Sequence, residues 1–564
     1  MSSNQRPHTN VGAGTLREPD EDKFTVNEGW SFFQQYLPDN SVIDSEPFSY
    51  NLIGIEGNGP YTVHIPAMPD MFLDPASLRL QGTCRIKYVK NNKKEDSLPK
   101  RPAYPLPKSL QEPKFELKFT HIVEGKANKH TKTPVDLVTD KHIPITVTDA
   151  AGANPKTEFY KISVVNSTAK ETEGTLVVPV NLMCQAMWKD IEIKLNSRTV
   201  TKNANLEYAT KAYLETILTY GNDALNTHLQ SEMWHPDSAS EVKDKEYEIK
   251  LKKFATNEIK NRKYCRDQDF SFCMQLHTEF NSINGFIMDQ MPYTFTFVRN
   301  DPSFFLRTDE KEESCNTGYY TVDFSSLKLT GNFLKPSPEV YNQYRAHLAS
   351  DTPFLYQTTR TDILTSQIQS GATNFDWNSI FASDMLPDTI YVCMVDMNAK
   401  NGAWHKDPFK FQHYGVSSIH LRINNRNLPV EPLTPTWKNE DNKNDDQMLA
   451  FKQLYENCSV KLNNVGLSIT PEKFQYGSTI FAWDLNHDQC AGAHANHGDL
   501  VGSASIHMVF RKAIEQNVCV IVAGVFRDYL AINNERKPNV LTSYGVEKYY
   551  EQLGLPVPKY KREL

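Results

Sequence analysis

The chain has 564 residues, of which 39% are hydrophobic and 23% are charged, and its net charge is −7 at pH 7. This composition builds packed cores, in two large domains or in three to four small ones, and it excludes a largely disordered chain. The acidic balance argues against tight non-specific binding to nucleic acid, and the N-terminal segment mixes both signs of charge, unlike a basic genome-binding arm. We therefore expect no sequence-specific contact with nucleic acid.

Cysteine usage and targeting signals indicate the cellular compartment in which the protein is expected. Nine cysteines are dispersed without a CxxC pair, which is typical of reduced, buried thiols. No positively charged and then apolar signal peptide opens the sequence, and without one the final KREL does not act as an ER-retention signal. The most apolar run, Val518–Phe526, is far shorter than the roughly 20 residues of a membrane helix. We expect a protein that is neither secreted through a signal peptide nor inserted into a membrane.

Strand patterns dominate the chain after a predicted N-terminal tail. Apolar and polar residues alternate with a period of two, which indicates strands with one buried face. Such stretches are Asp269–His277, Tyr293–Val298, Tyr320–Phe324, Ile419–Ile423 and Ala504–Phe510, and further strands are expected at Tyr61–Ala67, Ser77–Lys90 and Asn517–Asn533. Thr389–Met397 is nearly all apolar, so both of its faces are expected to be covered. The short spacing of strands between Pro-, Asn- and Gly-rich loops favours β-sandwiches of the jelly-roll type.

Few helices are predicted. Glu207–Tyr220 has an apolar face at helical spacing, and Gly221 follows as a stop signal. A shorter helix is expected over Pro336–Leu348. Two stretches, Pro99–Pro113 and Lys438–Gln447, are expected to be surface loops.

One internal similarity suggests that the same architecture occurs twice. Ile191–Arg198 (IEIKLNSR) resembles Ile419–Arg426 (IHLRINNR), since each has alternating aliphatic residues and then Asn-x-Arg where the strand should turn. A repeated architecture of this kind would place a junction near residues 340–355.

A cluster of potential metal ligands, HDQCAGAHANH, lies at His487–His497. Its order, H-x2-C-x3-H-x2-H, matches no standard zinc pattern, and the Ala-Gly-Ala between the ligands is expected to be a flexible loop. The overlapping Asp484–Asp488 fits the first ligand positions of an EF-hand loop, but Gln489 replaces the required Gly and Ala495 the bidentate Glu. A turn-rich loop between strands is the favoured interpretation, with zinc as the alternative. We predict no metal site and no cofactor.

No standard catalytic signature is present. The sequence has no GxSxG, HExxH or P-loop motif and no strand-led GxGxxG. His277, on a strand expected over Phe270–Phe280, and His420 are interpreted as strand residues at packing surfaces rather than as general bases. The glycosylation sequon at Asn166 is expected to be unused. We predict no catalytic residues and a protein that is not an enzyme.

Seven segments occur in an order that is typical of one family. They are Pro179–Asn196, Tyr208–Gly221, His228–Trp234, Met385–Asp388, Lys406–Phe411, Tyr476–Leu485 and Gly498–Phe510. Together they resemble the major capsid proteins of Polintons (Maverick elements) and related adintovirus-like elements, over roughly residues 43–540. Two departures, Asp407 in place of the family's Asn and Asp484–Asp488 in place of its DLTPD turn, are expected to lie in loops.

The resemblance implies an all-β double jelly roll, with two tandem eight-stranded antiparallel β-sandwiches and a few short helices in loops. The expected divisions are an N-terminal tail at 1–42, a first jelly roll with long loop insertions at 43–345, a second jelly roll at 346–540 and a C-terminal tail at 541–564. The family offers no catalytic residues that could be carried over to this chain.

The resemblance also implies a function and partners. It implies a structural major capsid protein that forms pseudo-hexameric homotrimers in the icosahedral shell of a double-stranded-DNA virus-like element. The implied partners are other copies of the chain, within and between trimers, and a single jelly-roll penton or minor capsid protein. The implied location is the virion capsid, after synthesis in the host cytoplasm, with the host nucleus as a candidate site of assembly.

Two alternatives remain open. One is a β-sandwich protein that binds carbohydrate or another ligand without catalysis, whose sign would be a monomer with an aromatic-lined groove. The other is a zinc-dependent enzyme centred on residues 487–497, whose sign would be stoichiometric zinc.

Overall fold

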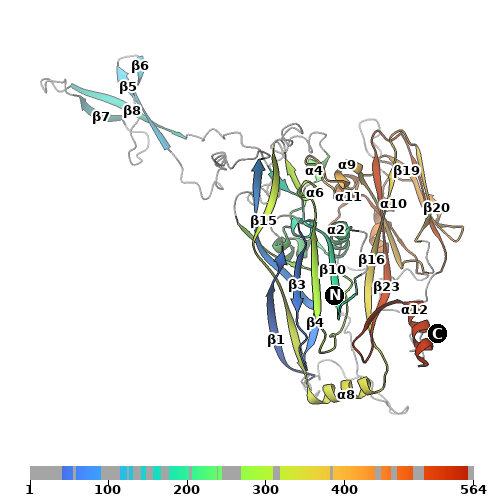
Figure 1. The fold of residues 1–564 in the computed structure, drawn as a ribbon. Helices are drawn as coiled ribbons and strands as arrows, with labels where there is room; N and C mark the ends of the chain where they lie inside the picture. The colour runs from blue at the N-terminus through green and yellow to red at the C-terminus, as the bar shows by residue number, and fades with distance from the viewer. Residues whose placement is uncertain are drawn as a thin grey trace, which may run out of the picture.

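The computed structural model describes fifteen stretches of the chain. They are residues 41–54, 59–90, 115–123, 126–130, 142–147, 156–166, 177–201, 206–237, 239–243, 269–308, 318–381, 385–437, 446–458, 466–486 and 501–556. Figure 1 shows two tall β-sandwiches standing side by side, with α2 between them and α8 at one end.

The first sandwich is built from strands that precede residue 337. One sheet has the order β1-β15-β4-β12, and the other has the order β11-β10-β13-β3-β2. The strands are β1 (Val42–Asn51), β2 (Ile53–Gly54), β3 (Tyr61–Ile65), β4 (Phe72–Lys90), β10 (Trp188–Leu195), β11 (Arg198–Thr199), β12 (Phe270–Gln275), β13 (Tyr293–Arg299) and β15 (Gly318–Pro336). A separate two-stranded sheet joins β9 (Val177–Pro179) and β14 (Leu306–Thr308).

The second sandwich uses strands from residue 354 onward. Its sheets have the orders β16-β23-β18-β21, with β24 added beside β23, and β17-β22-β19-β20. The strands are β16 (Phe354–Ile368), β17 (Asn374–Ile380), β18 (Thr389–Asp396), β19 (Val416–Ile423), β20 (Arg426–Leu433), β21 (Ile480–Asp484), β22 (Ala504–Phe510), β23 (Val518–Ile532) and β24 (Pro538–Thr542).

The two sandwiches share one topology. If β1, β3, β4, β10, β11, β12, β13 and β15 are numbered one to eight, the sheet orders are 1-8-3-6 and 5-4-7-2. The same numbering of β16 to β23 gives 1-8-3-6 and 2-7-4-5, which is the same pair of sheets. Each unit is therefore an eight-stranded jelly roll, and the expected double jelly-roll fold is confirmed.

The period-two patterns locate strands correctly. Every stretch predicted from alternation overlaps an observed strand. In β13 the burial alternates strictly between buried and half-buried side chains, whereas seven of the eight residues of β18 are buried, so both of its faces are covered as expected. The edge strands β1, β17 and β20 were not predicted, since their exposed residues give no clear alternation.

The internal similarity corresponds to equivalent hairpins. In each jelly roll the fourth and fifth strands, β10–β11 and β19–β20, are joined by two residues with positive φ: 44° and 65° at Asn196 and Ser197, and 48° and 65° at Asn424 and Asn425. Positive φ at both central residues defines the type I′ turn, and Asn tolerates that conformation better than most residues do. The repeated Asn-x-Arg motif therefore marks the same turn twice.

Both predicted helices are present, as α2 (Tyr208–Thr219) and α8 (Pro338–Ala349). Ser337 caps α8, with Pro338 at its first position. Gly221 follows α2 in an extended conformation rather than as a left-handed stop. A Cβ there would lie 2.9 Å from the carbonyl oxygen of Gly466, so close backbone packing requires the glycine.

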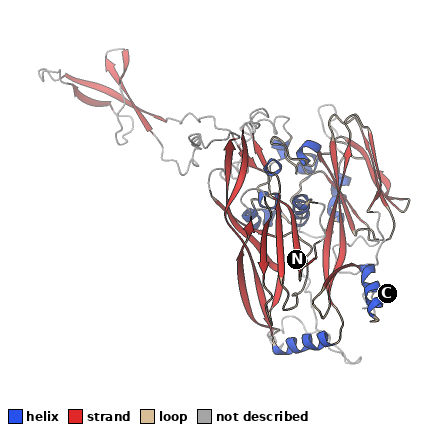
Figure 2. Cartoon of the chain, in the orientation of Figure 1, coloured by secondary structure: helices blue, strands red, loops and turns tan. Residues whose placement is uncertain are grey.

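Several shorter helices lie between the two sets of strands (Figure 2). The other helices of the described residues are α1 (Met183–Ala186), α3 (Asn222–Leu225), the 3-10 helix η2 (His228–Glu232), α4 (Ala239–Val242), α6 (Pro302–Phe305), α9 (Met397–Lys400), α10 (Met448–Asn457), α11 (Pro471–Gln475) and α12 (Ser543–Leu553). The stretch expected to be a C-terminal tail thus contains α12, which packs Val546 and Tyr550 against Tyr529 of β23.

A further sheet follows β4 in the chain and was not predicted. It has the order β6-β5-β8-β7 and pairs with no strand of the jelly rolls. Its strands are β5 (Phe115–Val123), β6 (Lys126–His130), β7 (His142–Val147) and β8 (Lys156–Asn166). The expected loop at 99–113, and residues 438–445 of the other expected loop, lie outside the described residues.

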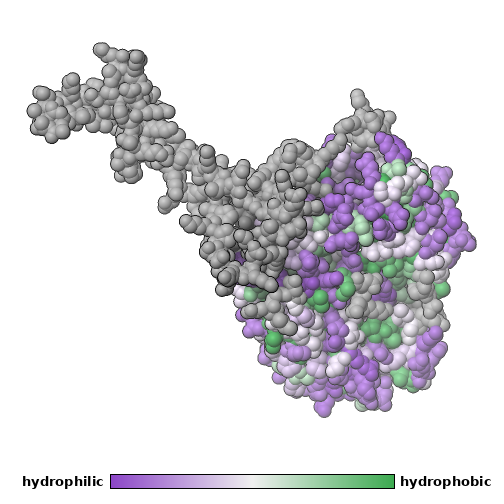
Figure 3. Space-filling model, turned by 45° about the horizontal axis from the view of Figure 1, so that its top comes forward, coloured by the Kyte–Doolittle hydropathy of each residue, from purple (hydrophilic) through white to green (hydrophobic). Residues whose placement is uncertain are grey.

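One large cluster of buried hydrophobic residues runs through both jelly rolls. In the first, Trp188 of β10 stacks on Phe324 of β15 with 5.9 Å between ring centroids, which joins the two sheets. On the outside, Figure 3 shows hydrophobic residues scattered among hydrophilic ones on the visible face.

The turn geometry yields a stability prediction. Ser197→Val places a β-branched residue at φ 65° and should lower the free energy of unfolding by about 1–2 kcal/mol, whereas Ser197→Gly should be neutral or stabilising by up to about 1 kcal/mol. Denaturant unfolding of the three proteins measures this difference. A Val variant as stable as the Gly variant would contradict the turn assignment.

Candidate functional site at the junction between the jelly rolls

A dense group of polar contacts joins the two jelly rolls at their junction. Among the described residues, no three His, Cys, Asp or Glu side chains are grouped so that they could hold a metal ion. The candidate ligands at His487–His497 lie outside the described residues, so neither the zinc interpretation nor its loop alternative has a structure to compare with. No helix in the described part of the chain is long and apolar enough to span a membrane.

Helix α2 occupies the space between the jelly rolls and is buried nearly all round. Ten of its 12 residues are buried, because one side packs on β10 and another on β16 of the second jelly roll. A helix enclosed in this way gives most of its polar side chains little access to solvent, so the buried ones need partners inside the junction.

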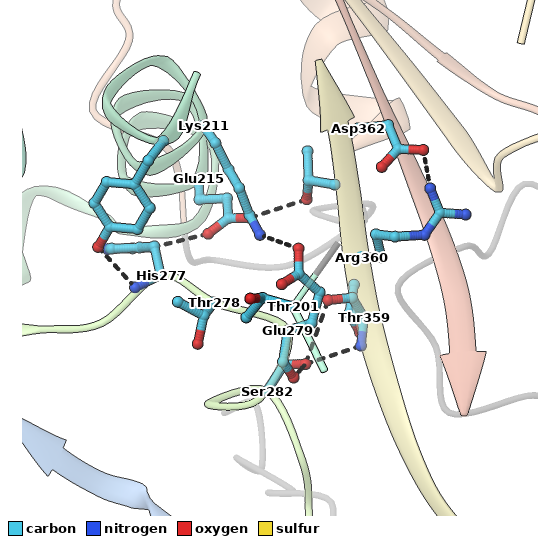
Figure 4. Close-up of polar contacts among 12 residues, drawn as sticks. Thr201, Lys211, Glu215, His277, Thr278, Glu279, Ser282, Thr359, Arg360 and Asp362 are labelled. Carbon is cyan, nitrogen blue, oxygen red and sulfur yellow. Dashed lines mark hydrogen bonds and ion pairs between the residues drawn. The ribbon is translucent and has the colours of Figure 1, made fainter. Parts of the chain in front are cut away.

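Lys211 is the buried cation of this helix. Its side chain is 3% exposed, and its Nζ lies 2.8 Å from Oε1 of Glu279 and 3.9 Å from Oε1 of Glu215 (Figure 4). Burial alone would lower the pKa of Lys211, but Glu279 and Glu215 outweigh it and raise the pKa above its usual value. The ammonium therefore stays charged inside the junction.

Glu215 connects the two jelly rolls directly. One carboxylate oxygen accepts a hydrogen bond from the Thr361 hydroxyl of β16 (2.9 Å), and the other lies 2.8 Å from Nδ1 of His277 (Figure 4). Burial raises the pKa of Glu215, but Lys211 and His277 more than offset it, so the pKa is lowered. His277 follows β12, which ends at Gln275, rather than lying within a strand, and its ring serves this contact.

On the second jelly roll, Arg360 supplies the neighbouring charge. Its Nε donates to Oδ2 of Asp528 at 2.7 Å, it also contacts Asp362, and its guanidinium lies over the ring of Phe526. The cavity beside it measures only about 10 Å³, which is room for one water molecule. The junction is thus closely packed around its charges.

A second group of contacts, at the α8 end, is centred on Asp289. This side chain is 1% exposed and accepts from Arg536 Nη2 (3.0 Å) and from the Tyr344 hydroxyl (2.5 Å). Tyr341, also on α8, donates to Asp70, and this bond raises the Tyr341 pKa to about 12. Asp289 therefore joins the first jelly roll, the connecting helix and the second jelly roll at one point.

Aromatic stacking closes the opposite part of the junction. Tyr213 of α2 stacks on Phe409 of the second jelly roll, with 4.2 Å between centroids and 2° between planes. Nearby, Lys400 of α9 binds Glu207, and the carbonyl oxygen of Thr308 lies 2.9 Å from Nδ1 of His405.

Five of the family-like segments meet here. One residue from each lines the same cavity: Asn181, Tyr213, Trp234, Phe409 and Tyr476. This cavity measures about 50 Å³, which suits a few water molecules and is small for a sugar ring. The segments that make the sequence family-like thus build the junction rather than a ligand site.

Asp407 has a larger role than a loop position would suggest. It is 7% exposed, accepts from the backbone N–H of Phe409 (2.8 Å), and its other oxygen lies 3.8 Å from Nη1 of Arg307 in the first jelly roll. An ionised Asp407 attracts the buried Arg307 across the junction more strongly than a neutral Asn would.

His420 lies on β19, as expected. Its ring stacks on His507 of β22, whose Nδ1 lies 2.7 Å from Asp376 and whose Nε2 lies 3.2 Å from the Ser505 hydroxyl. This spacing resembles a catalytic triad, but β22 pairs with β17 and β19 on both sides, so its ladder N–H groups are not free to form an oxyanion hole. We assign no catalytic role to it.

Comparisons with known proteins support the fold. No family model matches the chain. An uncharacterised protein of Caenorhabditis elegans, F54H12.2, is 24% identical over 330 residues, which is 57% of this chain and 72% of that protein. A chain in the cryo-EM structure of the Sputnik virophage is 11% identical with a TM-score of 0.53, and the match covers 98% of this chain and 97% of that one. The mavirus major capsid protein matches more loosely, with 8% identity, a TM-score of 0.43 and coverage of 94% and 97%. The Sputnik match, which spans nearly the whole of both chains, agrees with the fold derived above.

The buried cation yields a matched pair of predictions. Lys211→Met leaves Glu279, which is 10% exposed, without its cation and should lower the free energy of unfolding by about 3–5 kcal/mol. Lys452→Met removes an i,i+4 partner of Glu456 that is 74% exposed and should cost less than about 0.5 kcal/mol. Denaturant unfolding of both variants checks this, and equal effects would show that Lys211 is not a structural charge.

The lowered pKa of Glu215 predicts a pH dependence. Because the folded-state pKa lies below the ordinary value of 4.5, the carboxylate stabilises the fold above that pH and loses its contribution as the pH falls through the lowered pKa. The stability difference between wild type and Glu215→Gln should therefore be larger at about pH 6 than at about pH 3. A difference that does not change with pH would contradict the role given to Glu215.

Proposed function

We propose that this protein is a structural major capsid protein of a double-stranded-DNA virus-like element of the Polinton (Maverick) type. The observation that carries the proposal is the repeated topology: the same eight-stranded jelly roll occurs twice, and the two copies are joined by a buried, charged junction. A block of this kind presents two similar units side by side, so three chains can supply six similar corners.

The proposal includes the assembly. Homotrimers with a pseudo-hexagonal outline would tile an icosahedral shell, and a single jelly-roll penton protein would fill its vertices. The protein would then reside in the virion capsid and act without catalysis or cofactor. The divisions at 43–345 and 346–540 remain our proposed limits of the two jelly rolls.

A ligand-binding role has less support. The described cavities at the junction, of about 10 and 50 Å³, have room for water molecules but are small for a sugar. The described His and Cys side chains form no metal cluster.

The mass in solution tests the proposal. By size-exclusion chromatography with light scattering we expect a particle of about three times 64.5 kDa at micromolar concentration. A strictly monomeric protein under these conditions would contradict the capsid role. As a control, the protein is measured in two further samples, one with excess zinc and one with EDTA. Neither addition should change the mass.

A further inference from the structure

One contact at the junction joins two surfaces, and each of these surfaces has an equivalent on the other jelly roll. The turn of the first hairpin, β10–β11, docks on the second jelly roll. Asn196 Nδ2 donates to the carbonyl oxygen of Arg536 (3.1 Å), and Arg198 Nη1 lies 3.5 Å from the carbonyl oxygen of Pro538. Both acceptors belong to the segment that follows β23, the eighth strand of that jelly roll.

In the described part of the chain, the turn of the equivalent hairpin of the second jelly roll, β19–β20, makes no hydrogen bond to the other jelly roll. Asn424 instead bonds within its own jelly roll, accepting from the N–H of Ser503 and donating to the carbonyl of Val501. Arg426, the counterpart of Arg198 in the repeated Asn-x-Arg motif, is exposed, and Val430 of β20 is 86% exposed. This hairpin is therefore available for docking.

The surface that corresponds to the receiving segment can also be located. The end of the eighth strand of the first jelly roll and the residues that follow it, Pro336–Val340, lie beside the start of β1, because Val42 pairs with Pro336 and Ser337 N–H donates to the carbonyl oxygen of Ser41. We call this surface, formed by residues 42–46 and 336–340, the β1–α8 corner.

The β1–α8 corner is open and partly apolar. Ile43 is 56% exposed, Val42 36% and Val340 38%. The first six residues of β1 are exposed on both faces of the strand, whereas β16, its counterpart in the second jelly roll, is covered in part by the junction. The start of β1 is thus exposed where part of β16 is covered by the neighbouring jelly roll.

The charges of the two surfaces are complementary. The hairpin exposes Arg422 and Arg426, against Glu431. The β1–α8 corner exposes three carboxylates, those of Asp44, Glu46 and Glu339, and one exposed lysine, Lys335, lies next to it. Opposite net charges steer association and fix its orientation.

We propose that the β19–β20 hairpin of one copy docks on the β1–α8 corner of a second copy, repeating between chains the contact that β10–β11 makes within the chain. The contact joins two different surfaces, so it is heterologous and closes into a ring when the rotation fits. With three chains, intrachain and interchain contacts alternate around six jelly rolls. The inference rests on the proposed function, because it names the surfaces through which the trimer forms.

Charge reversal tests the contact. Arg426→Glu and Glu339→Arg should each raise the concentration at which the trimer dissociates at least tenfold, measured by light scattering over a dilution series. The double variant should recover most of the wild-type value. Val430→Asp should act like Arg426→Glu, since it places a carboxylate against the acidic corner.

The control is Glu515→Lys. Glu515 is exposed in the β22–β23 loop, at the opposite end of the sheet from the hairpin, because Ile423 pairs with Ala504 and Val416 with Phe510. This reversal should leave trimer dissociation unchanged. Thermal unfolding of each variant separates a lost contact from a misfolded chain.

A cross-link gives an independent test. Chains with Val430→Cys and chains with Val340→Cys, when mixed and oxidised, should form a disulfide-linked pair more than tenfold in excess of either variant alone. If wild type is a trimer but neither the reversals nor the cross-link show these effects, the contact is wrong and the capsid proposal stands. A monomeric wild type overturns both.

Discussion

The fold as a whole depends on a helix between the two jelly rolls whose buried charge is paired with opposite charges. Lys211 sits in α2, is 3% exposed, and has carboxylates on either side from Glu279 and Glu215. Glu215 in turn accepts from Thr361 of the second jelly roll. A buried ion pair adds little net stability over a well-packed apolar pair, but losing one partner is costly. The arrangement therefore favours one relative position of the two jelly rolls over other packings.

A rigid junction explains why the chain can act as a single block. Contacts at three places hold it: the Lys211 cluster, the Asp289 group near α8 and the stack of Tyr213 on Phe409. Each involves a different pair of segments, so a rotation about one would break the others. The alternation of intrachain and interchain contacts proposed above requires this rigidity, because a flexible pair of jelly rolls would close into rings of varied size.

The sequence predicted the strands better than it predicted their surroundings. Period-two patterns identified the central strands, whose burial is decided locally by alternating side chains, and Asn-x-Arg marked both type I′ turns. The edge strands β1 and β20 were missed because exposed residues carry no pattern. The sheet of β5 to β8 was missed because its segment was interpreted only as part of a loop insertion.

The junction could be predicted only in part. The family-like segments pointed to the correct residues, such as Tyr213 and Phe409, but were not connected to one another. Lys211 reads as an ordinary helical lysine, and its partner Glu279 lies 68 positions away along the chain. Pairings of that range follow from the packing of the two jelly rolls and leave no local signal in the sequence.

Electron microscopy of the purified oligomer tests the central claim, that two equivalent jelly rolls per chain form a six-cornered building block. We expect class averages with threefold symmetry and six similar lobes. At higher resolution, the β19–β20 hairpin should lie against the β1–α8 corner of the next copy. Twofold particles, open filaments or rings with another number of lobes would contradict it.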